Sequence, residues 1–147
     1  MANITSSLLR NGGPILRQLL TSVALLAASV AAPVAQAEPI VHAVKYLVYS
    51  NVPLSVDIYY RVTDPPAWAD YSHDPYQYSP KAEATVGPNT PWELHTGLVD
   101  PGQWAMVVAA ISSPAEEPEI RCELTVDGAV VSTNKGPKGA LCSIRSW

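Results

Sequence analysis

The chain has 147 residues, with nine Lys or Arg against thirteen Asp or Glu, and its formal net charge at pH 7 is −4. This acidic balance argues against nucleic acid or an anionic lipid surface as the main partner, because both reward clustered Lys and Arg. Beyond residue 37 the balance is seven basic against thirteen acidic residues, a net charge of −6. That part is long enough for one domain with a single core.

Residues 1–37 have the organisation of a secretory signal peptide. They contain Arg10 and Arg17 and no acidic residue, and they continue into the apolar run LLTSVALLAASVAAPVAQA. The run ends in the small-x-small triplet A-Q-A. A basic region, an apolar stretch and such a triplet predict cleavage between Ala37 and Glu38.

The alternative for the same segment is an uncleaved membrane anchor. The uncharged run from Gln18 to Ala37 is just long enough to span a bilayer, although its Ala, Ser, Gln and Thr content makes it a weak span. Both interpretations place residues 38–147 outside the cytoplasmic membrane, because the arginines stay on its inner side. We therefore expect an exported protein, either secreted or held at the cell envelope on the periplasmic side of the membrane.

The two cysteines of the chain are Cys122 and Cys142. Outside the cytoplasm, a pair of cysteines in a small domain predicts a disulfide. A bond that closes a loop of about 20 residues stabilises a fold by on the order of 3 kcal/mol. A zinc site would need two further ligands, and His42, His73 and His95 all lie upstream. A C-x-x-C redox motif is absent as well.

The first β-rich segment, residues 40–50, is nearly apolar on both faces, which predicts a strand covered on both sides. In residues 53–64, PLSVDIYYRVTD, apolar and polar residues alternate with the period of a half-buried strand. Pro65 and Pro66 end this pair of strands. Residues 63–80, TDPPAWADYSHDPYQYSP, then form one long irregular loop, and loops of this length in compact domains are commonly functional or disordered.

Six further β-rich segments follow, separated by turn residues. Asp-Pro-Gly at 100–102 suits a tight turn, and Asp-Gly at 127–128 is a strong hairpin signal. The alternation around Cys122 points this cysteine inward. Seven or eight short strands, twelve prolines and no convincing helix after residue 37 predict an all-β, antiparallel β-sandwich of Ig-like type. The six segments are 81–87, 91–97, 103–112, 119–126, 129–133 and 139–146.

The sequence contains no G-x-S-x-G elbow, H-E-x-x-H, Walker loop or dinucleotide-binding glycine motif. Asp70, His73 and Asp74 could supply metal ligands, but hydrogen-bonded turn residues explain the same spacing more simply. Glu93 and His95 could form an acid and base pair on one face of a strand, which an exposed polar face explains equally well. We therefore predict no enzyme activity, no cofactor and no metal site.

Aromatic side chains make the loop at 63–80 a candidate partner-contact surface, because they bury large area at little entropic cost. The alternative is that they fold back as a lid over one end of the sandwich, and the sequence favours neither. Trp92 and Trp104 lie in strand contexts and are predicted to be core residues. The candidate contact residues of the loop are Trp68, Tyr71, His73, Tyr76 and Tyr78.

The runs TPWELHTGL, WAMVVAAIS, IRCELTVDGAVVST and GALCSI follow one another in the second half of the chain. Together they resemble the extracytoplasmic domain of the mycobacterial membrane protein small family, MmpS. In that family a Pro-Trp strand, an apolar strand, a Cys-x-x-x-Val-Asp-Gly hairpin and a second Cys occur in this order. Upstream, AVKYLVYSNVPLSVDIYY is similar to the opening two strands of the family. The resemblance covers roughly residues 40–64 and 85–145.

The resemblance implies a non-catalytic accessory protein beside a large resistance-nodulation-division (RND) transporter of MmpL type, which exports siderophores or complex lipids to the cell envelope. It places Cys122 and Cys142 on the cysteine positions of the family and brings no catalytic residue. The chain departs from the family in its predicted cleavage site and in the insert PPAWADYSHDPYQYSP. The alternative function is a free secreted Ig-like module that recognises a lipid, glycan or protein through residues 63–80.

Overall fold

The structure is a computed structural model that describes residues 36–113 and 116–146. The predicted signal or anchor segment lies almost wholly outside the described residues, so its cleavage between Ala37 and Glu38 stays a prediction. Ala37–Trp147 forms one compact unit. Among the described residues, no helix has the length and apolar character needed to cross a membrane.

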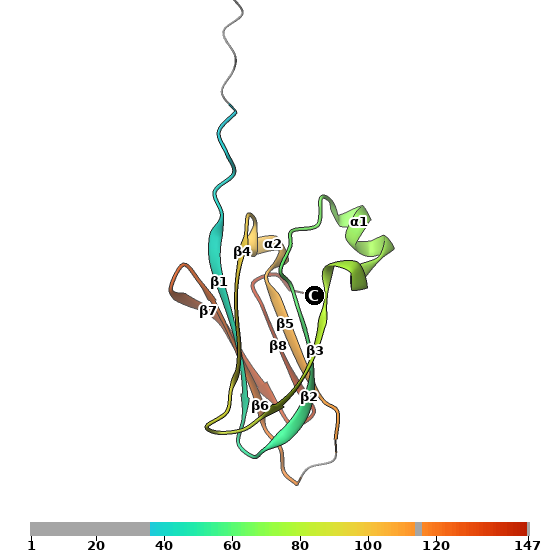
Figure 1. Cartoon of the computed structure of the whole chain (residues 1–147), viewed down its shortest axis with the longest axis vertical. Coiled ribbons are helices and arrows are strands. Elements are labelled where there is room, and N and C mark those ends of the chain that lie inside the picture. The colour runs from blue at the N-terminus through green and yellow to red at the C-terminus, as the bar shows by residue number, and fades with distance from the viewer. Residues whose placement is uncertain (1–35, 114–115, 147) are drawn as a thin grey trace, which may run out of the picture. The chain divides into compact units, whose positions relative to one another are not determined.

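Eight strands form two antiparallel four-stranded sheets, which pack face to face (Figure 1). Sheet A has the strand order β4-β1-β6-β7 and sheet B the order β3-β2-β5-β8. The predicted all-β antiparallel sandwich is therefore confirmed. The strands are β1 (His42–Ser50), β2 (Leu54–Tyr60), β3 (Lys81–Val86), β4 (Trp92–Leu98), β5 (Met106–Ile111), β6 (Ile120–Val126), β7 (Ala129–Gly136) and β8 (Gly139–Ser143).

The core lies between the sheets and is built by the alternation of the strands. Tyr46 of β1 and Ile58 of β2 are completely buried, and so is Val107 of β5. The prediction that β1 is covered on both sides is wrong, because none of the helices and strands in residues 36–113 and 116–146 covers the outer face of sheet A. Lys45 and Leu47, on that outer face, are only half-buried.

The prediction that no helix follows residue 37 is wrong in detail, because two short helices and one 3-10 turn occur at the ends of strands. They are α1 (Trp68–His73), η1 (Pro75–Tyr78) and α2 (Pro101–Trp104). The expected tight turn at 100–102 continues into α2 because the Asp100 carboxylate accepts a hydrogen bond from the Gln103 N–H at 3.0 Å. The following strand consequently begins at Met106 instead of residue 103.

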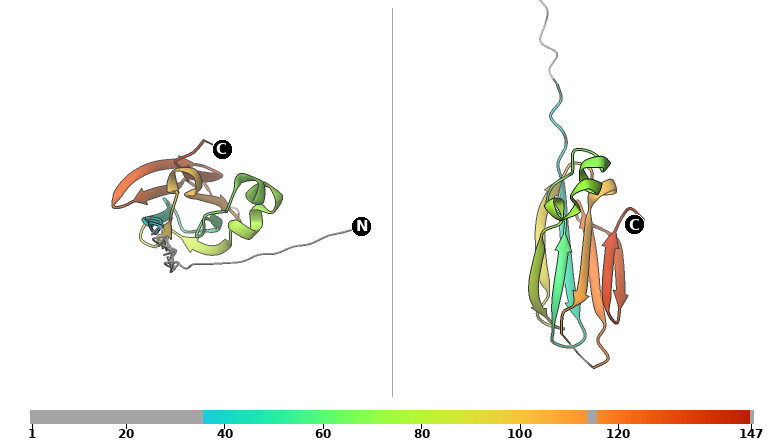
Figure 2. Two further views of the ribbon diagram at one scale, coloured as in Figure 1. Left: turned by 90° about the horizontal axis from the view of Figure 1, so that it is seen from above. Right: turned by 90° about the vertical axis from the view of Figure 1, so that its right-hand side faces the viewer.

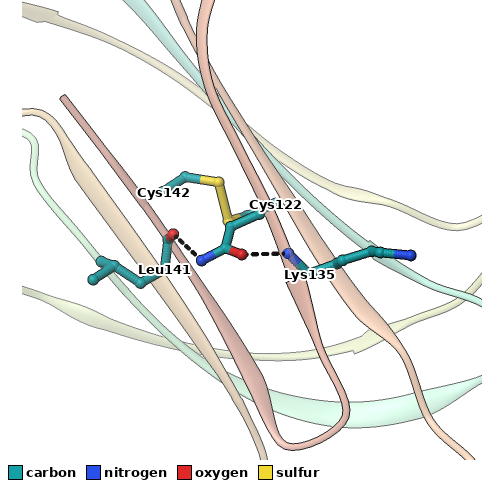
Figure 3. Close-up of a disulfide and its surroundings, with 5 residues drawn as sticks. Cys122, Lys135, Leu141 and Cys142 are labelled. Carbon is teal, nitrogen blue, oxygen red and sulfur yellow. Dashed lines mark hydrogen bonds between the residues drawn. A yellow bond between two sulfur atoms is a disulfide. The ribbon is translucent and has the colours of Figure 1, made fainter.

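The two cysteines lie at bonding distance, as predicted, with 2.07 Å between their sulfur atoms (Figure 3). Cys122 belongs to β6 of sheet A and Cys142 to β8 of sheet B, so the bond joins the two sheets through the core. Beside it, the Asn134 side-chain amide donates a hydrogen bond to the Leu141 carbonyl at 3.0 Å. The disulfide and this bond link the sheets along the edge formed by β7 and β8.

The Asp-Gly hairpin at 127–128 is confirmed between β6 and β7. Both residues have positive φ, 49° at Asp127 and 83° at Gly128, as a tight two-residue hairpin requires. The Asp127 carboxylate accepts hydrogen bonds from the Ala43 N–H at 2.9 Å and from the His42 ring at 2.6 Å. These two bonds lower the pKa of the Asp127 carboxyl, the His42 bond most, and they tie the hairpin to the start of β1.

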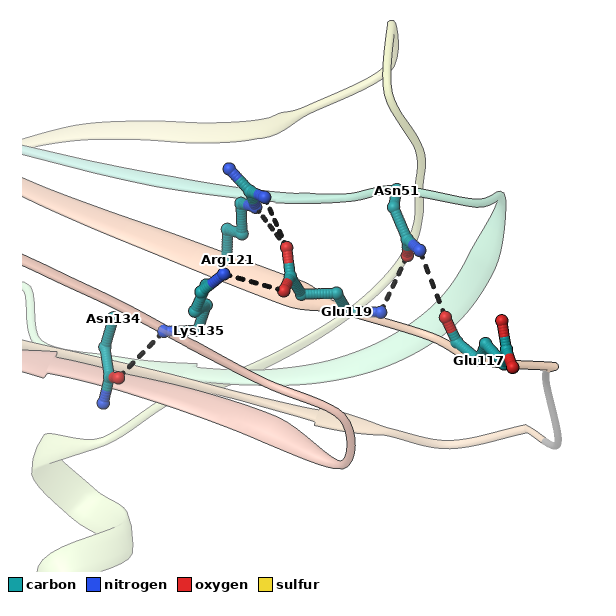
Figure 4. A network of polar contacts seen from close by, with 6 residues as sticks. All are labelled: Asn51, Glu117, Glu119, Arg121, Asn134 and Lys135. Carbon is teal, nitrogen blue, oxygen red and sulfur yellow. Dashed lines mark hydrogen bonds and ion pairs between the residues drawn. The ribbon is translucent and has the colours of Figure 1, made fainter.

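The opposite end of the sandwich is held by a polar network (Figure 4). Glu119 pairs with Lys135 at 3.0 Å and with Arg121, and these cations hold the pKa of its carboxyl below the usual range. The Asn51 side chain accepts a hydrogen bond from the Glu119 N–H at 2.7 Å and donates one to the Glu117 carbonyl at 3.1 Å. The loop before β6 is thereby fixed to the turn between β1 and β2.

Acid is expected to weaken the fold through three carboxyl groups whose pKa is lowered, those of Glu93, Glu119 and Asp127. A lowered pKa in the folded state contributes stability above the unfolded pKa, about 4, and this stability is lost as the pH falls through the folded pKa. Melting followed by circular dichroism should therefore show a falling midpoint below about pH 4. Glu119→Gln should flatten this fall, whereas Glu116→Gln, outside the network, should leave it unchanged.

Candidate partner-binding end of the sandwich

Residues 63–80 fold as a lid against the side of the sandwich, near one of its ends (Figures 1 and 2). The Asp64 carboxylate fixes the start of the lid, because it accepts hydrogen bonds from the Val99 and Asp100 N–H groups, both at 2.8 Å. The Asp74 carboxylate accepts one from the Gln77 N–H and so begins η1. The loop lies beside the outer face of sheet B, between β2 and β3.

Arg61, which the sequence alone does not single out, lies at the centre of the lid. The alternation of β2 directs its side chain outward from sheet B, yet its exposed fraction is 0% because the lid covers it. Its Nη1 donates a hydrogen bond to the Tyr78 carbonyl at 3.0 Å. Its guanidinium carbon lies 4.4 Å from the centre of the Tyr71 ring and 5.7 Å from that of Trp104. Such cation–π contacts stabilise a desolvated guanidinium.

The aromatic stack continues outward from Arg61. Trp68 stacks on Trp104 with ring centres 6.2 Å apart and planes 18° apart, and it contacts Tyr71 at 5.3 Å. The Arg145 guanidinium carbon lies 4.3 Å from the centre of the Trp68 ring. Two cations and three aromatic rings therefore hold α1 against the sandwich.

The sequence left two roles open for the aromatic residues of the loop, contact with a partner and packing as a lid. The structure gives different roles to different residues. Trp68 and Tyr71 form the lid, and Tyr78 supplies the carbonyl that receives the Arg61 hydrogen bond. Tyr76 is 77% exposed, and His73 is exposed as well. Tyr76 and His73, together with Trp68, which is 45% exposed, thus remain candidates for contact with a partner.

The two tryptophans predicted for the core occupy different places. Trp92 of β4 is half-buried and packs against the core, with its ring 5.3 Å from that of Tyr60. Trp104 is only 4% exposed, but it ends α2 and lies beneath the lid. Close by, the Tyr46 hydroxyl donates a hydrogen bond to the Arg61 carbonyl at 2.8 Å, and burial raises the pKa of Tyr46. A neutral tyrosine therefore anchors the Arg61 backbone from the core side.

The polar pairs considered from the sequence lie at the surface. His95 and Glu93 are 2.6 Å apart on the outer face of β4, and this hydrogen bond lowers the pKa of the Glu93 carboxyl. Asp70 and His73 belong to α1, and Asp74 follows them at its end. Within residues 36–113 and 116–146, no three His, Cys, Asp or Glu side chains gather in a way that could hold a metal ion.

Exposed apolar side chains gather at the lid end of the sandwich. At this end β1, β3, β5 and β7 begin and β2, β4, β6 and β8 finish. All nine large apolar side chains that are exposed in the described part of the chain lie here, and the opposite end has none. They are Ile40, Val41, Val62, Trp68, Tyr76, Val99, Val130, Val131 and Ile144.

The same end is acidic. The exposed cations beside it in the described residues are Lys81, which pairs with Asp57 and Glu83, and Arg145, which stacks on Trp68. A surface of this kind combines exposed apolar side chains with negative charge. The acidic residues of the lid end are Glu38, Asp64, Asp70, Asp74, Asp100 and Asp127.

Comparison with known proteins shows that the sandwich is similar to uncharacterized mycobacterial proteins. The family model of the Rv2576c beta-sandwich domain matches residues 46–142, which include both cysteines, Arg61 and the lid. Similar proteins are uncharacterized protein Rv2576c of Mycobacterium tuberculosis (strain H37Rv) and uncharacterized protein Mb2606c of Mycobacterium bovis. Each is 34% identical over 114 residues, which cover 78% of this chain and 73% of the relative. The finer assignment to MmpS stays a prediction.

Proposed function

The chain belongs to the family of the Rv2576c beta-sandwich domain, and we propose that it is a non-catalytic exported accessory protein of MmpS type. In this role it binds a large RND-type transporter and assists the export of siderophores or lipids to the cell envelope. The observation that carries the proposal is the gathering of all nine exposed large apolar side chains at the lid end. Exposed apolar side chains gathered in this way mark a contact surface for a protein or a membrane.

The charge of the lid end favours a protein over an anionic membrane as the partner. Its six carboxylates would be repelled by acidic lipid head groups but would complement a surface rimmed with Lys or Arg. The chain also enters β1 at this end. An anchor that ends at Ala37 therefore tethers the lid end near the membrane, since the five residue steps to His42 span at most about 18 Å.

Crosslinking from the two ends of the sandwich tests the proposal. A photoreactive phenylalanine analogue at Tyr76, on the lid end, should give a crosslink to a large membrane transporter when the full-length protein is expressed in mycobacterial cells. The same analogue at Lys138, on the opposite end, is the matched control and should give none. Mass spectrometry of the crosslinked band identifies the partner. Equal crosslinking from both positions, or no transporter peptide from the Tyr76 position, would refute the accessory role.

A free secreted binding module is the second candidate, and a pocket of about 410 Å³ between the lid and sheet B favours it. The mature N-terminus separates the two candidates. Protein that begins at Glu38 in the culture filtrate supports the secreted module, whereas intact protein confined to membranes supports the accessory subunit. In a deletion strain, an export defect for a siderophore or lipid is expected only for the accessory subunit.

A further inference from the structure

The pocket between the lid and sheet B adjoins Tyr71, which lies over the buried guanidinium of Arg61. Within the described residues, no carboxylate forms an ion pair with Arg61, and the Nε and Nη2 atoms of this side chain have no hydrogen-bond partner. The nearest acidic residue in sequence, Asp64, uses both carboxylate oxygens on the backbone N–H groups of Val99 and Asp100. A buried charge without an ion pair or a full set of hydrogen bonds costs folding free energy unless another group compensates it.

The pocket shares a wall with this guanidinium. Tyr71 lies over the guanidinium and also lines the pocket. Ser79 is another lining residue, and its hydroxyl oxygen is buried without a partner in the described part of the chain. Ser79 follows Tyr78, whose carbonyl accepts the hydrogen bond from Arg61 Nη1. The pocket is lined by Tyr59, Tyr71, Pro75, Tyr76, Ser79 and Met106.

We propose that this pocket binds a small amphiphilic anion, with a carboxylate or phosphate group directed toward Arg61 and Ser79 and an apolar body among the tyrosines. The unused donors of Arg61 suit an oxyanion, because guanidinium groups bind carboxylate and phosphate through paired hydrogen bonds. The aromatic rings and Met106 suit the apolar body. The pocket volume also falls in the range of small-molecule sites.

The lid is built in a way that lets the anion reach the guanidinium. Helix α1 has six residues and none of them is buried, so its hold on the sandwich depends on side-chain stacking. Rotation of the half-buried Tyr71 ring opens the pocket wall toward Arg61. The ligand then replaces the π contact by charge-assisted hydrogen bonds, which are stronger. Tyr76 lines this pocket and also belongs to the proposed transporter-contact surface, so the two sites adjoin. The titration below uses the purified protein and therefore tests the pocket without the transporter.

Calorimetric titration of the protein, purified in the form that the cell exports, tests the site with three probes. They are 4-phenylbutyrate, phenyl phosphate and the neutral 4-phenylbutanol. We expect at least one anion to bind about tenfold or more tightly than the alcohol. A hydrogen bond to a charged group contributes enough binding free energy for this difference. The tighter of the two anions identifies the head group. Equal binding of all three probes, or no binding at roughly 10 mM, would overturn the proposal.

Two variants test whether the charge of Arg61 causes the preference for the anionic probes over the neutral alcohol. Arg61→Gln should remove the preference for the anion, whereas Arg121→Gln, on the other sheet, should change it less than about twofold. If Arg61→Gln does not fold, Ser79→Ala replaces it and should weaken the anion several-fold while leaving the alcohol unchanged. An anion preference that survives in Arg61→Gln and in Ser79→Ala would show that neither residue receives the anion.

Discussion

Replacing both Cys122 and Cys142 with alanine is expected to lower the free energy of unfolding by on the order of 3 kcal/mol. The bond closes a loop of sequence separation 20, and this constraint on the unfolded chain has about that value. The bond also joins sheet A to sheet B within the core, where both cysteines are almost completely buried. Urea unfolding followed by tryptophan fluorescence measures the change as a lower midpoint.

Reduction provides the control for this prediction. Dithiothreitol should destabilise the parent protein by nearly as much as the double substitution does, and it should leave the double variant unchanged. The small cavity left by the two alanines is present in the variant with and without dithiothreitol, so it cancels in that comparison, and it adds to the loss only when the variant is compared with the parent protein. A loss below about 1 kcal/mol in the double variant, against the roughly 3 kcal/mol expected for such a loop, would mean that the bond adds little. Two free thiols in the exported protein under non-reducing mass analysis would contradict the bond itself.

The strands and the disulfide follow from local patterns, and for this reason the sequence predicts them well. In residues 53–64 and 119–126 the alternation of apolar and polar residues is strict, and β2 and β6 lie within these ranges with the expected faces buried. The inward position of Cys122 follows from the same alternation. The outer face of β1 was harder to predict, because apolar side chains such as Leu47 can be half-buried at a surface without a covering layer.

The lid could not be predicted from local patterns, because the contacts that order it join distant parts of the chain. Arg61 directly follows β2, where the alternation of residues 53–64 continues to an outward position, so the pattern predicts an exposed cation. Its burial depends on Tyr71 in the lid and on Trp104, which lies 43 positions further along the chain. The position of Trp104 in turn depends on the extension of a turn into α2. A long aromatic loop directly after an outward-facing Arg is the signal that could have suggested the stack.

The apolar lid end has no signature in any single stretch of the sequence. Its nine side chains are spread from Ile40 to Ile144 as five single residues and two adjacent pairs. They come together because antiparallel strands return every second connection to the same end of the sandwich. This surface can therefore be recognised only once the strand order is known. Tyr76, in contrast, is predicted as a contact residue from the aromatic composition of residues 63–80 alone.

Trp104→Ala is expected to have the largest effect of any single substitution on the candidate site. Removing a buried tryptophan costs about 3–5 kcal/mol of folding free energy. Here it also removes the ring on which Trp68 stacks and one of the two aromatic faces beside Arg61. We therefore expect the lid to open under conditions where the two sheets remain folded.

Hydrogen exchange at the lid distinguishes local opening from general destabilisation. The Tyr71 N–H bonds to the Ala67 carbonyl and the Asp74 N–H to that of Asp70, so these two amides report whether α1 is formed. In Trp104→Ala both should exchange faster, while the amides of β1 and β6 keep their protection. Trp92→Ala is the matched control, because Trp92 packs against the core and contacts Tyr60 rather than the lid. This variant should lower the unfolding free energy without exposing α1. If α1 exchanges equally fast in both variants, Trp104 has no special role in holding the lid. If it exchanges faster only in Trp104→Ala, the stack beneath Trp68 is what keeps the candidate site closed.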